Sequence, residues 1–383
     1  MAPLHVGLNL IYLVPGETGG MEVVARELIP ALAASGRVRL TAFVNREAAE
    51  AGGAPGCERI EQVTVPVRAR NRVEWVRGEQ QLLPRLAARA GVDLVHSLAS
   101  TAPAWGRFVR VVTIHDLIFW RYPEAHAGLR TRGMKVLVPL AARRSHRILA
   151  DSASTRDDLI RHLRTPAERI DVVPLGVGAT PSVEPLPESE VRRRHDLGAR
   201  RMVLSVSAKR PHKNLLGLLD AWALIPGEDR PILVIPGYPT WHEAELGERA
   251  AVLGLSDDVR LPGWVDDAEL EGLYAAAAGF VFPSFYEGFG MTVLEAMRRG
   301  VPVACSDRSS LPEVAGDAAL TFDPERPADI AAAVRSLLGD PVRAQRLRAA
   351  GRARAARFTW EATAGAVLDS YDRAVAASRS VPR

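Results

Sequence analysis

The sequence has little of what a disulfide framework, a membrane span or a metal centre requires. Of its 383 residues only Cys57 and Cys305 are cysteines, which excludes a disulfide scaffold and a thiolate metal site. No run reaches the roughly 20 apolar residues of a membrane-spanning helix. The chain also has no D-x-D triplet and no His/Cys spacing typical of a metal site, so we expect no bound metal ion.

The charge of the chain is nearly balanced. It has 49 basic and 45 acidic residues, a net charge of +4, which does not by itself indicate nucleic-acid binding. Its composition, 47% hydrophobic and 25% charged, is typical of a soluble globular protein. The N-terminal segment MAPLHVGLNLIYLVPGE has no basic region before its apolar residues, unlike a secretory leader. We therefore expect a cytoplasmic protein with no nucleic-acid partner.

Short apolar runs alternate with helical patterns along most of the chain, which predicts parallel sheets. The expected strands of the first half lie at 4–10, 38–44, 60–65, 94–96, 109–114, 148–150 and 170–173, and the expected helices at 21–35, 74–90, 128–144 and 154–163. A stretch rich in Pro, Gly and Glu at 174–190 is typical of a linker. The alternation then restarts, with expected strands at 202–206, 232–235, 259–261, 279–282 and 303–305.

These patterns predict an α/β protein made of two doubly wound, Rossmann-like domains that face each other across a cleft. We place the N-terminal domain at 1–180 and the C-terminal domain at 190–358. The region 327–378 is helical in pattern and contains no further strand. We expect its last helix, about 360–383, to pack back on the N-terminal domain.

The stretch FYEGFGMTVLEAM, residues 285–297, places two glutamates eight positions apart around a glycine pair. A strand is expected before it and a helix after it, so Glu287 lies in the turn and Glu295 in the second helical turn. Ligands bind at such strand ends in open α/β sheets, and a sugar nucleotide offers hydroxyls to the carboxylates and anionic oxygens to the amides. Alternatively, both glutamates are solvated. The amides expected to face the ligand belong to Gly288, Phe289 and Gly290.

Four basic residues lie within five positions after the strand expected at 202–206, namely Lys209, Arg210, His212 and Lys213. Cationic side chains at a strand end can neutralise a diphosphate leaving group, whose charge grows as its bond to a sugar breaks. We select Lys213 first and Arg210 second. The alternative is a solvated loop.

The first half offers a glycine loop and a histidine at strand ends. Gly16, Gly19 and Gly20 lie between the first strand and its helix, where glycine lets the backbone approach an anion, although a plain tight turn fits equally well. His115 follows the strand at 109–114 and is expected to hydrogen-bond a substrate, the alternative being a structural hydrogen bond.

Taken together, these segments resemble glycosyltransferase family 4, the retaining, metal-independent enzymes of the GT-B fold. The strongest match is PSFYEGFGMTVLEAMRRGVPVACSDRSSLPEVAGDAALTFDP, residues 283–324, whose two glutamates fit the family's E-x7-E pattern. The segments PHKN, GW, TIHDL and DSASTRDDL fall in the family's order and spacing. The resemblance covers nearly the whole chain.

The resemblance implies a role for each candidate residue. Glu287 would contact the hydroxyls of the donor sugar, Glu295 the nucleotide ribose and Lys213 the phosphates. The amides after Glu287 would hold the sugar and the diphosphate, and His115 would sit by the reacting sugar. The remaining implied contacts are the diphosphate with Gly19 and Gly20, and the base with the backbone of Gly263, Trp264 and Val265. The nucleotide sugar is the substrate, and no cofactor is expected.

Three positions depart from the family's pattern. Ala208 stands where many members have a phosphate-binding arginine, Ser207 where glycine is usual, and Gly178 where an aspartate is common. The first departure puts the phosphate contacts in doubt, with Arg210 or Lys209 as the candidate replacements.

The segments TIHDLIFWRYPE, VVPLGV and PHKN resemble the mannosyltransferase-like branch of the family, which implies GDP-mannose as donor, with UDP-glucose or another UDP-hexose second. The acceptor is a saccharide, a lipid-linked or a small-molecule hydroxyl. A GT-B epimerase, a phosphorylase and a non-catalytic sugar-nucleotide binding module are the alternative functions.

Basic residues at 68–72 and 130–144, with Trp75 and Met134 nearby, form a possible peripheral contact with an anionic membrane; solvated helix faces are the alternative. The basic residues concerned are Arg68, Arg70, Arg72, Arg130, Arg132, Lys135, Arg143 and Arg144.

Overall fold

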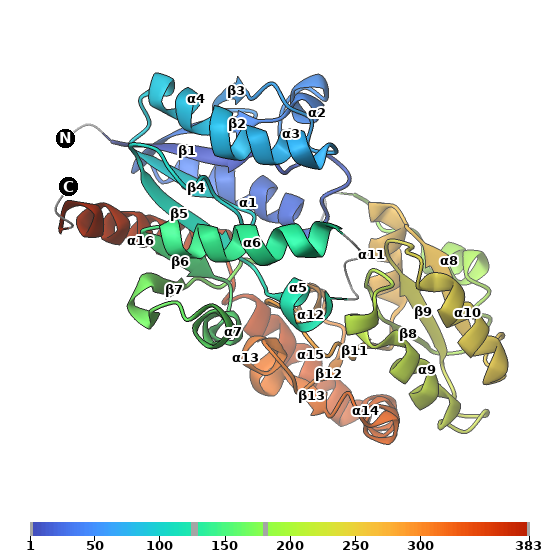
Figure 1. The fold of residues 1–383 in the computed structure, drawn as a ribbon. Coiled ribbons are helices and arrows are strands. Elements are labelled where there is room, and N and C mark those ends of the chain that lie inside the picture. Colours follow the sequence, from blue (N-terminus) through green and yellow to red (C-terminus); the bar gives the residue numbers. More distant parts are fainter. Residues whose placement is uncertain (1–2, 124–128, 179–182, 381–383) are drawn as a thin grey trace. The chain divides into compact units, whose positions relative to one another are not determined.

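The structure is a computed structural model that describes residues 3–123, 129–178 and 183–380, without the side chains of 129–131 and 380. The chain divides into two compact units (Figure 1). Unit 1 comprises Met1–Gly178 and Phe358–Arg383, and unit 2 comprises Ala179–Arg357.

Unit 1 contains a seven-stranded sheet in the order β3-β2-β1-β4-β5-β6-β7, with every neighbouring pair parallel. Its strands are β1 (Leu4–Leu10), β2 (Val38–Val44), β3 (Glu61–Thr64), β4 (Leu94–Ser97), β5 (Val109–Ile114), β6 (Arg147–Ala150) and β7 (Ile170–Val172). Its helices are α1 (Gly20–Ala34), α2 (Arg46–Glu50), α3 (Arg72–Arg77), the π-helical turn η1 (Gly78–Leu82), α4 (Leu83–Ala90), α5 (Ile118–Arg121), α6 (Leu129–Arg144), α7 (Ala153–Leu163) and α16 (Trp360–Ser380).

Helices cover both faces of the sheet of unit 1, as a parallel sheet requires. The C-terminal helix α16 packs against α1, β5 and β6, whereas α6 packs against β5 from the other side (Figure 1). The α16 contact includes a buried hydrogen bond of 2.8 Å between Tyr371 Oη and His96 Nδ1. Trp360 lies so close to Gly176 that a Cβ on the glycine would come within 2.6 Å of the Trp360 backbone nitrogen.

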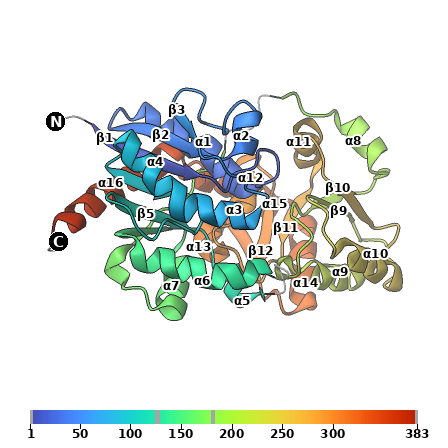
Figure 2. The same cartoon turned by 45° about the horizontal axis from the view of Figure 1, so that its top comes forward.

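Unit 2 contains a six-stranded parallel sheet in the order β10-β9-β8-β11-β12-β13 (Figure 2). Its strands are β8 (Met202–Leu204), β9 (Ile232–Pro236), β10 (Val259–Gly263), β11 (Gly279–Phe282), β12 (Val303–Ser306) and β13 (Ala319–Phe322). Its helices are α8 (Glu188–Arg194), α9 (Leu215–Ala223), α10 (Glu243–Val252), α11 (Asp267–Ala276), α12 (Met291–Arg298), α13 (Leu311–Ala315), α14 (Pro327–Gly339) and α15 (Pro341–Ala355). Helices α9, α10 and α14 bury one apolar face of the sheet around the fully buried Trp222.

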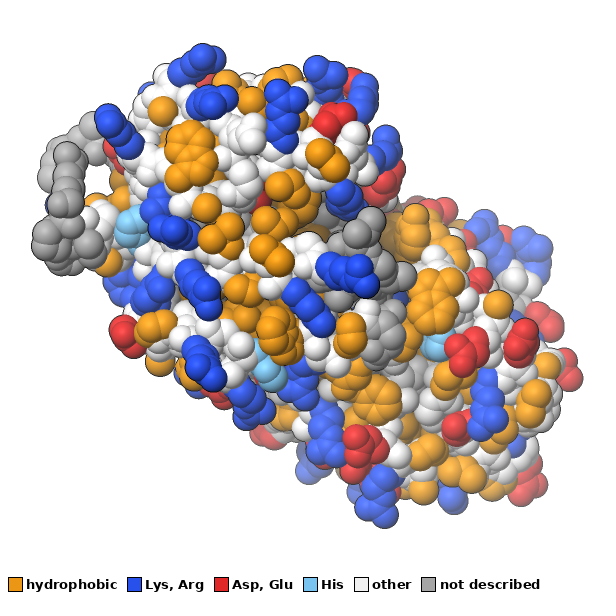
Figure 3. Space-filling view, in the orientation of Figure 1, with side chains coloured by type: hydrophobic (Ala, Val, Ile, Leu, Met, Phe, Trp, Pro, Cys, Tyr) orange, Lys and Arg blue, Asp and Glu red, His pale blue; other side chains and the backbone are white. Residues whose placement is uncertain are grey.

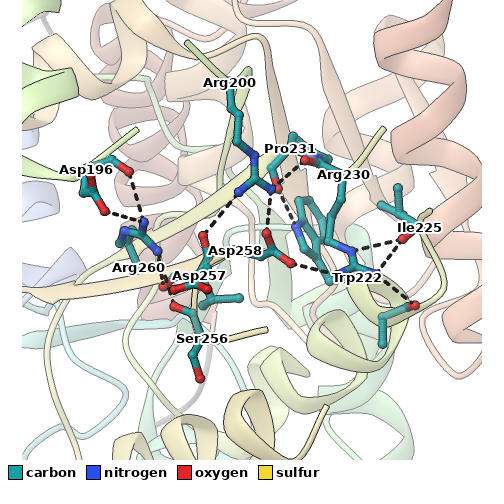
Figure 4. Close-up of polar contacts among 12 residues, drawn as sticks. Asp196, Arg200, Trp222, Ile225, Arg230, Pro231, Ser256, Asp257, Asp258 and Arg260 are labelled. Atoms are coloured by element: carbon teal, nitrogen blue, oxygen red, sulfur yellow. Dashed lines mark hydrogen bonds and ion pairs between the residues drawn. The ribbon is translucent and has the colours of Figure 1, made fainter. Parts of the chain in front are cut away.

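Arginines hold the amino edge of the sheet of unit 2 together (Figure 4). Arg200 and Arg230 converge on Asp258, with Nη to Oδ distances of 2.6 and 2.7 Å. Arg230 also donates to the carbonyl of Ile225, which follows α9, and Arg260 donates to the carbonyl of His195, which follows α8. At this edge the charged side chains therefore bind one another and nearby backbone carbonyls.

The predicted fold class is confirmed, because both units are parallel α/β sheets with the doubly wound strand order. Several elements differ from the expectation. The helix expected at 74–90 is divided into α3, the π-helical turn η1 and α4, and the short helices α2, α5 and α13 were not predicted. Strand β13 was not predicted, since it is short and only Phe322 is buried in it. Helix α8 begins inside the stretch taken as a linker, because Pro187 precedes two acidic residues in its first turn, which favours a helix start. The expected start of α6 at Gly128 lies outside the described residues.

Candidate active site

The strand order reverses in the middle of each sheet, and ligands of doubly wound folds bind at the carboxyl ends of the two strands concerned. In unit 2 these strands are β8 and β11, which pair in parallel although the strands β9 and β10 separate them in the sequence. The loop after β8 contains Lys213, and the turn after β11 contains Glu287. The two candidate residues are therefore brought together by the sheet topology.

Lys213 and Glu287 form an ion pair at this point. Lys213 Nζ lies 2.7 Å from Glu287 Oε1 and 3.0 Å from Oε2, and the side chains are 17% and 11% exposed. The ammonium also lies 5.2 Å from the centre of the Phe282 ring. The pair is partly shielded from water, which strengthens its attraction, yet it retains access to a ligand.

Local structure places Lys213 where it can reach Glu287. A 3₁₀ turn, Pro211–Lys213, follows the β8 loop, and Asn214 ends it in the left-handed conformation at φ 54°. The Asn214 side chain donates to the carbonyl of Pro324 at 2.7 Å, and Phe285 N donates to the carbonyl of His212 at 2.9 Å. These bonds join the loop after β8 to the segment after β13 and to the turn after β11.

Two serines orient the glycine-rich turn. Ser309 Oγ donates to the Glu287 carbonyl at 2.6 Å, and Ser310 Oγ donates to the carbonyls of Glu287 and Phe289 at 3.0 and 2.7 Å. In a trans peptide the N–H points opposite to the carbonyl. The N–H groups of Gly288 and Gly290 therefore point away from the serines, as expected if they face a ligand.

Glu295 lies on α12, one turn and a half from Gly290, and is half-buried. Arg299 Nη1 donates to the Glu295 carbonyl at 3.0 Å, and its Nε lies 2.9 and 3.0 Å from the two carboxylate oxygens of Glu271 on α11. The same guanidinium stacks on Tyr274, 4.6 Å from the ring centre. Helix α12 is therefore anchored to α11 directly beneath Glu295.

The basic residues after β8 differ in their environments. Lys209 is completely buried and donates to the Gly237 carbonyl at 2.8 Å, with Glu243 at 4.0 Å. Burial lowers the pKa of Lys209 to about 8, and Glu243 opposes the shift. The expectation that Lys209 can replace the missing phosphate-binding arginine is wrong, because its ammonium points into the protein. Arg210 is half-buried at the start of the 3₁₀ turn and remains the candidate.

The expected base-binding segment lies at the end of β10. Gly263 is the last residue of the strand, has φ 73° and accepts a hydrogen bond of 2.8 Å from Gly237 N. The Trp264 side chain is 71% exposed and Val265 is half-buried. Asp266 caps α11 by accepting from Glu269 N at 2.8 Å, as its spacing predicts.

In unit 1, the glycine loop precedes α1. Gly19 is the N-cap of the helix at φ 63°, and Gly20 is its first residue. The Glu22 carboxylate accepts from Gly16 N at 2.9 and 3.1 Å, so an acidic side chain of the protein already takes one backbone donor of the loop. The roles of Gly19 and Gly20 in donor binding stay predictions.

His115 follows β5, and both of its ring nitrogens bind within unit 1. Nδ1 lies 2.6 Å from Asp151 Oδ2, and Nε2 lies 2.7 Å from the Leu98 carbonyl. Burial lowers the pKa of His115, but Asp151, Leu98 and Asp116 outweigh it and raise the pKa to about 9. The ring is therefore a doubly bonded imidazolium at neutral pH, and its contact with a sugar stays a prediction.

Sequence reasoning missed a buried carboxyl group at the corresponding point of unit 1, where β1 and β4 are neighbours. Glu79, on η1, is 2% exposed and accepts from Asn9 and Thr101 at 3.0 and 2.7 Å. Burial raises the pKa of Glu79, and its hydrogen bonds oppose the shift. The π-helical turn that aims Glu79 inward has no spacing signal in the sequence, so no pattern could have identified it.

Within residues 3–123, 129–178 and 183–380, no three His, Cys, Asp or Glu side chains are grouped as metal ligands would be. No helix in the same ranges has the length and apolar character needed to cross a bilayer.

Comparison with known proteins identifies the family of the chain. Residues 18–180 match the family model described as Glycosyltransferase Family 4, and residues 188–354 match that of Glycosyl transferases group 1. The chain is 37% identical over 271 residues to the O-antigen chain mannosyltransferase B of Escherichia coli, covering 68% of this chain and 69% of the relative.

Two solved structures have the same fold at low sequence identity. Sucrose-phosphate synthase from Thermosynechococcus elongatus superimposes with a TM-score of 0.76 at 21% identity, over 98% of this chain and 100% of that one. Anabaena HepE, solved in complex with UDP and glucose, superimposes with a TM-score of 0.72 at 19% identity, over 96% and 99%. The family models and the mannosyltransferase relative show that this chain belongs to the group 1, family 4 glycosyltransferases, enzymes of the GT-B fold.

Proposed function

We propose that this glycosyltransferase moves a mannosyl group from a nucleotide diphosphate sugar to a hydroxyl of a saccharide acceptor, with retention of anomeric configuration and without a metal ion. The observation that carries the proposal is the Lys213–Glu287 pair at the β8/β11 reversal point. A cation beside a carboxylate supports the proposal, because a diphosphate would bind the cation and sugar hydroxyls would bind the carboxylate.

Each candidate residue of unit 2 is assigned a different contact with the donor. Lys213, helped by Arg210, neutralises the diphosphate, and Glu287 accepts hydrogen bonds from the sugar hydroxyls. Glu295 accepts from the ribose hydroxyls, and the N–H groups of Gly288 and Gly290 donate to the sugar and phosphate oxygens. In this arrangement cationic side chains supply the charge stabilisation that a divalent ion provides in other transferases.

Transfer proceeds by cleavage of the bond between the anomeric carbon and the phosphate oxygen, whose electron pair leaves with the nucleoside diphosphate. The sugar passes through an oxocarbenium-like state, and the acceptor oxygen attacks from the face that the phosphate leaves. The acceptor's proton passes to the departing phosphate, so no separate carboxylate base is required. Lys213 stabilises the charge that grows on that phosphate in the transition state.

GDP-mannose is the first candidate donor, because the relative with 37% identity is named a mannosyltransferase. A UDP-hexose is the second, because HepE is solved with UDP and glucose. The deciding experiment incubates the protein with GDP-mannose, UDP-glucose and UDP-galactose, with and without EDTA, and measures acceptor-dependent release of nucleoside diphosphate. Mannosyl transfer unaffected by EDTA supports the proposal, whereas no turnover of any donor, or loss of activity with EDTA, contradicts it.

The stereochemistry of the product is measured separately. The anomeric proton of the transferred sugar in the product is compared with that of the donor by NMR. An inverted product would contradict the mechanism while leaving the transferase activity intact.

We further propose that the acceptor is lipid-linked and that unit 1 contacts an anionic membrane surface through α6. Arg132, Lys135, Arg143 and Arg144 are exposed on this helix, and Figure 3 shows basic and apolar side chains side by side on this face. Lys135 Nζ lies 5.8 Å from the ring of the exposed Trp120.

Other residues of the expected basic face contribute less. Arg68 is paired with Glu50, and Arg70 with Glu17, so their charges are neutralised. The side chain of Arg130 lies outside the described residues.

Binding to vesicles containing an anionic lipid tests the membrane contact. Binding that weakens as salt rises from low to physiological ionic strength is expected, because the attraction is electrostatic. The absence of binding at low salt would contradict the membrane contact without affecting the donor site.

A further inference from the structure

Two aromatic rings stand exposed at adjacent strand ends of unit 2. Tyr238 follows β9 and is 55% exposed, and Trp264 follows β10 and is 71% exposed. Their ring centres are 6.3 Å apart, with the planes inclined by 72°. Large aromatic rings normally bury most of their surface, so a pair that exposes this much is not explained by folding.

The backbone that carries the two rings is held rigidly. Gly237 adopts φ 134°, donates to the Gly263 carbonyl, and is packed so closely that a Cβ would come within 2.3 Å of the Ser207 carbonyl oxygen. Lys209 N donates to the Tyr238 carbonyl at 3.2 Å, and the buried Lys209 ammonium donates to the Gly237 carbonyl. The loops after β8, β9 and β10 are thus joined into one platform, from which the side chains of Tyr238 and Trp264 project.

The rings lie on the side of the platform where a donor would continue beyond its phosphates. Reading along the carboxyl edge in the strand order, Glu287 follows β11, Lys213 follows β8, Tyr238 follows β9 and Trp264 follows β10. Neighbouring strands are about 4.8 Å apart, so the strands that precede the two rings lie one and two strand spacings from β8. With the sugar assigned to Glu287 at one end of this order, the aromatic pair at the other end is the place left for the base.

We propose that Tyr238 and Trp264 together hold the nucleobase of the donor by stacking, and that this base site accepts purines and pyrimidines alike. The proposal rests on the donor site proposed above and adds Tyr238, from a different loop, to the expected contact with the β10 end. Stacking does not read hydrogen-bonding edges, because every base has a π-face. The nearby Thr240 hydroxyl is already engaged, as it donates to the Lys209 carbonyl.

The test measures binding of UDP, GDP and inorganic diphosphate to the full chain by calorimetry. Tyr238→Ala and Trp264→Ala are each expected to weaken UDP and GDP binding about 5-fold or more, while diphosphate binding stays unchanged. Tyr238→Phe and Trp264→Phe keep a π-face and should retain most of the affinity. Wild-type affinities for UDP and GDP are expected to agree within about 10-fold.

Trp241→Ala is the matched control, since Trp241 lies in the same β9–α10 loop and is 63% exposed, but its ring neighbour is His242 at 5.3 Å. It should bind both nucleotides like the wild type. All substituted side chains are exposed, so the thermal unfolding temperature should not change.

Each contrary result has a distinct meaning. Unchanged nucleotide affinity in Tyr238→Ala and Trp264→Ala overturns the stacking site but leaves the donor site intact. A preference for one base above about 100-fold overturns the claim of base tolerance. If the wild type binds diphosphate and no nucleotide, the stacking site fails as well; if it binds none of the three, the proposed function itself fails.

Discussion

The two sheets share one topology, but the points at which their strand orders reverse carry different chemistry. In unit 1, the β1/β4 point is occupied by Glu79, a buried carboxyl group held by neutral donors. In unit 2, the β8/β11 point carries the Lys213–Glu287 ion pair, which retains some exposure. Figure 2 shows both sheets with their helical covers.

The difference shows that the sheet topology creates a reversal point in each unit, whereas the side chains at that point determine its function. Burial raises the pKa of the Glu79 carboxyl group, which accepts its hydrogen bonds from neutral donors of unit 1. A lysine and a glutamate that neutralise each other can exchange partners with a ligand that offers a phosphate and hydroxyls. This difference supports the proposal that unit 2 binds the donor.

The largest expected effect comes from breaking the pair of unit 2. Lys213→Ala and Glu287→Ala should each lower transfer by about 100-fold or more, because each removes a group that stabilises the donor or its leaving charge. The measurement is acceptor-dependent release of nucleoside diphosphate, with circular dichroism as the check on folding. Full activity in either variant would contradict the assignment.

A surface pair of unit 2 is the control for that experiment. Arg249 and Asp220 are 2.6 Å apart and 42% and 33% exposed. Exposed ion pairs contribute little to stability, so Arg249→Ala should change the free energy of unfolding by no more than about 1 kcal/mol. Its transfer activity should equal that of the wild type.

The next effect concerns the charged pair of unit 1. The folded-state pKa of His115, about 9, lies above the ordinary value of 6.5, so its stabilising contribution is complete below pH 6.5 and is lost as the pH rises to 9. Asp151→Asn removes the main partner that raises this pKa. In urea unfolding at pH 6.5 and pH 9, the wild type should lose up to a few kcal/mol more stability than Asp151→Asn. Equal losses would show that His115 is not an imidazolium.

A smaller effect tests the glycine turn of unit 2. At Gly290, φ is 107° and a Cβ would come within 2.8 Å of Leu311 Cδ2. Gly290→Ala is therefore expected to lower the free energy of unfolding by about 1–3 kcal/mol. It should also raise KM for the donor. Gly247→Ala, inside α10 with no atom within 4 Å of the new Cβ, should instead stabilise by about 0.5–1 kcal/mol. Similar effects of both substitutions would argue against a conformational requirement at Gly290.

The smallest expected effect is a pH dependence of stability at Lys209, opposite in sign to that of His115 in unit 1. The pKa of Lys209 is lowered from 10.5 to about 8, so its charged burial costs stability at neutral pH, and the cost is relieved as the pH rises from 8 to 10.5. Lys209→Met should change stability by no more than about 1 kcal/mol at pH 7 and should abolish this alkaline gain. Chemical unfolding of the wild type and of Lys209→Met at pH 7, 8 and 10 measures these free energies. A large loss of stability in Lys209→Met at pH 7 would contradict the expectation.

Much of the fold was predictable, because apolar runs in a two-sided parallel sheet leave a plain signal. Strands β1, β2, β5 and β11 begin and end where the pattern predicted. The placement of Glu287 in a turn and Glu295 on a helix was likewise correct, since glycines and helix formers determine local conformation.

Side-chain direction within a loop was not predictable. Lys209 and Lys213 are four residues apart in one basic run, yet one is buried against the Gly237 carbonyl and the other binds Glu287. The difference arises from the left-handed Asn214 and from contacts with loops far away in the sequence.

The order of residues along the chain was enough to establish two α/β units and the chemical type of each strand-end loop, because hydrophobic periodicity and turn residues act over short distances. The pairing of Lys213 with Glu287, the inward turn of Lys209 and the meeting of Tyr238 with Trp264 came from the folded arrangement. Each joins loops that follow different strands, and their proximity depends on sheet order, which local sequence does not encode.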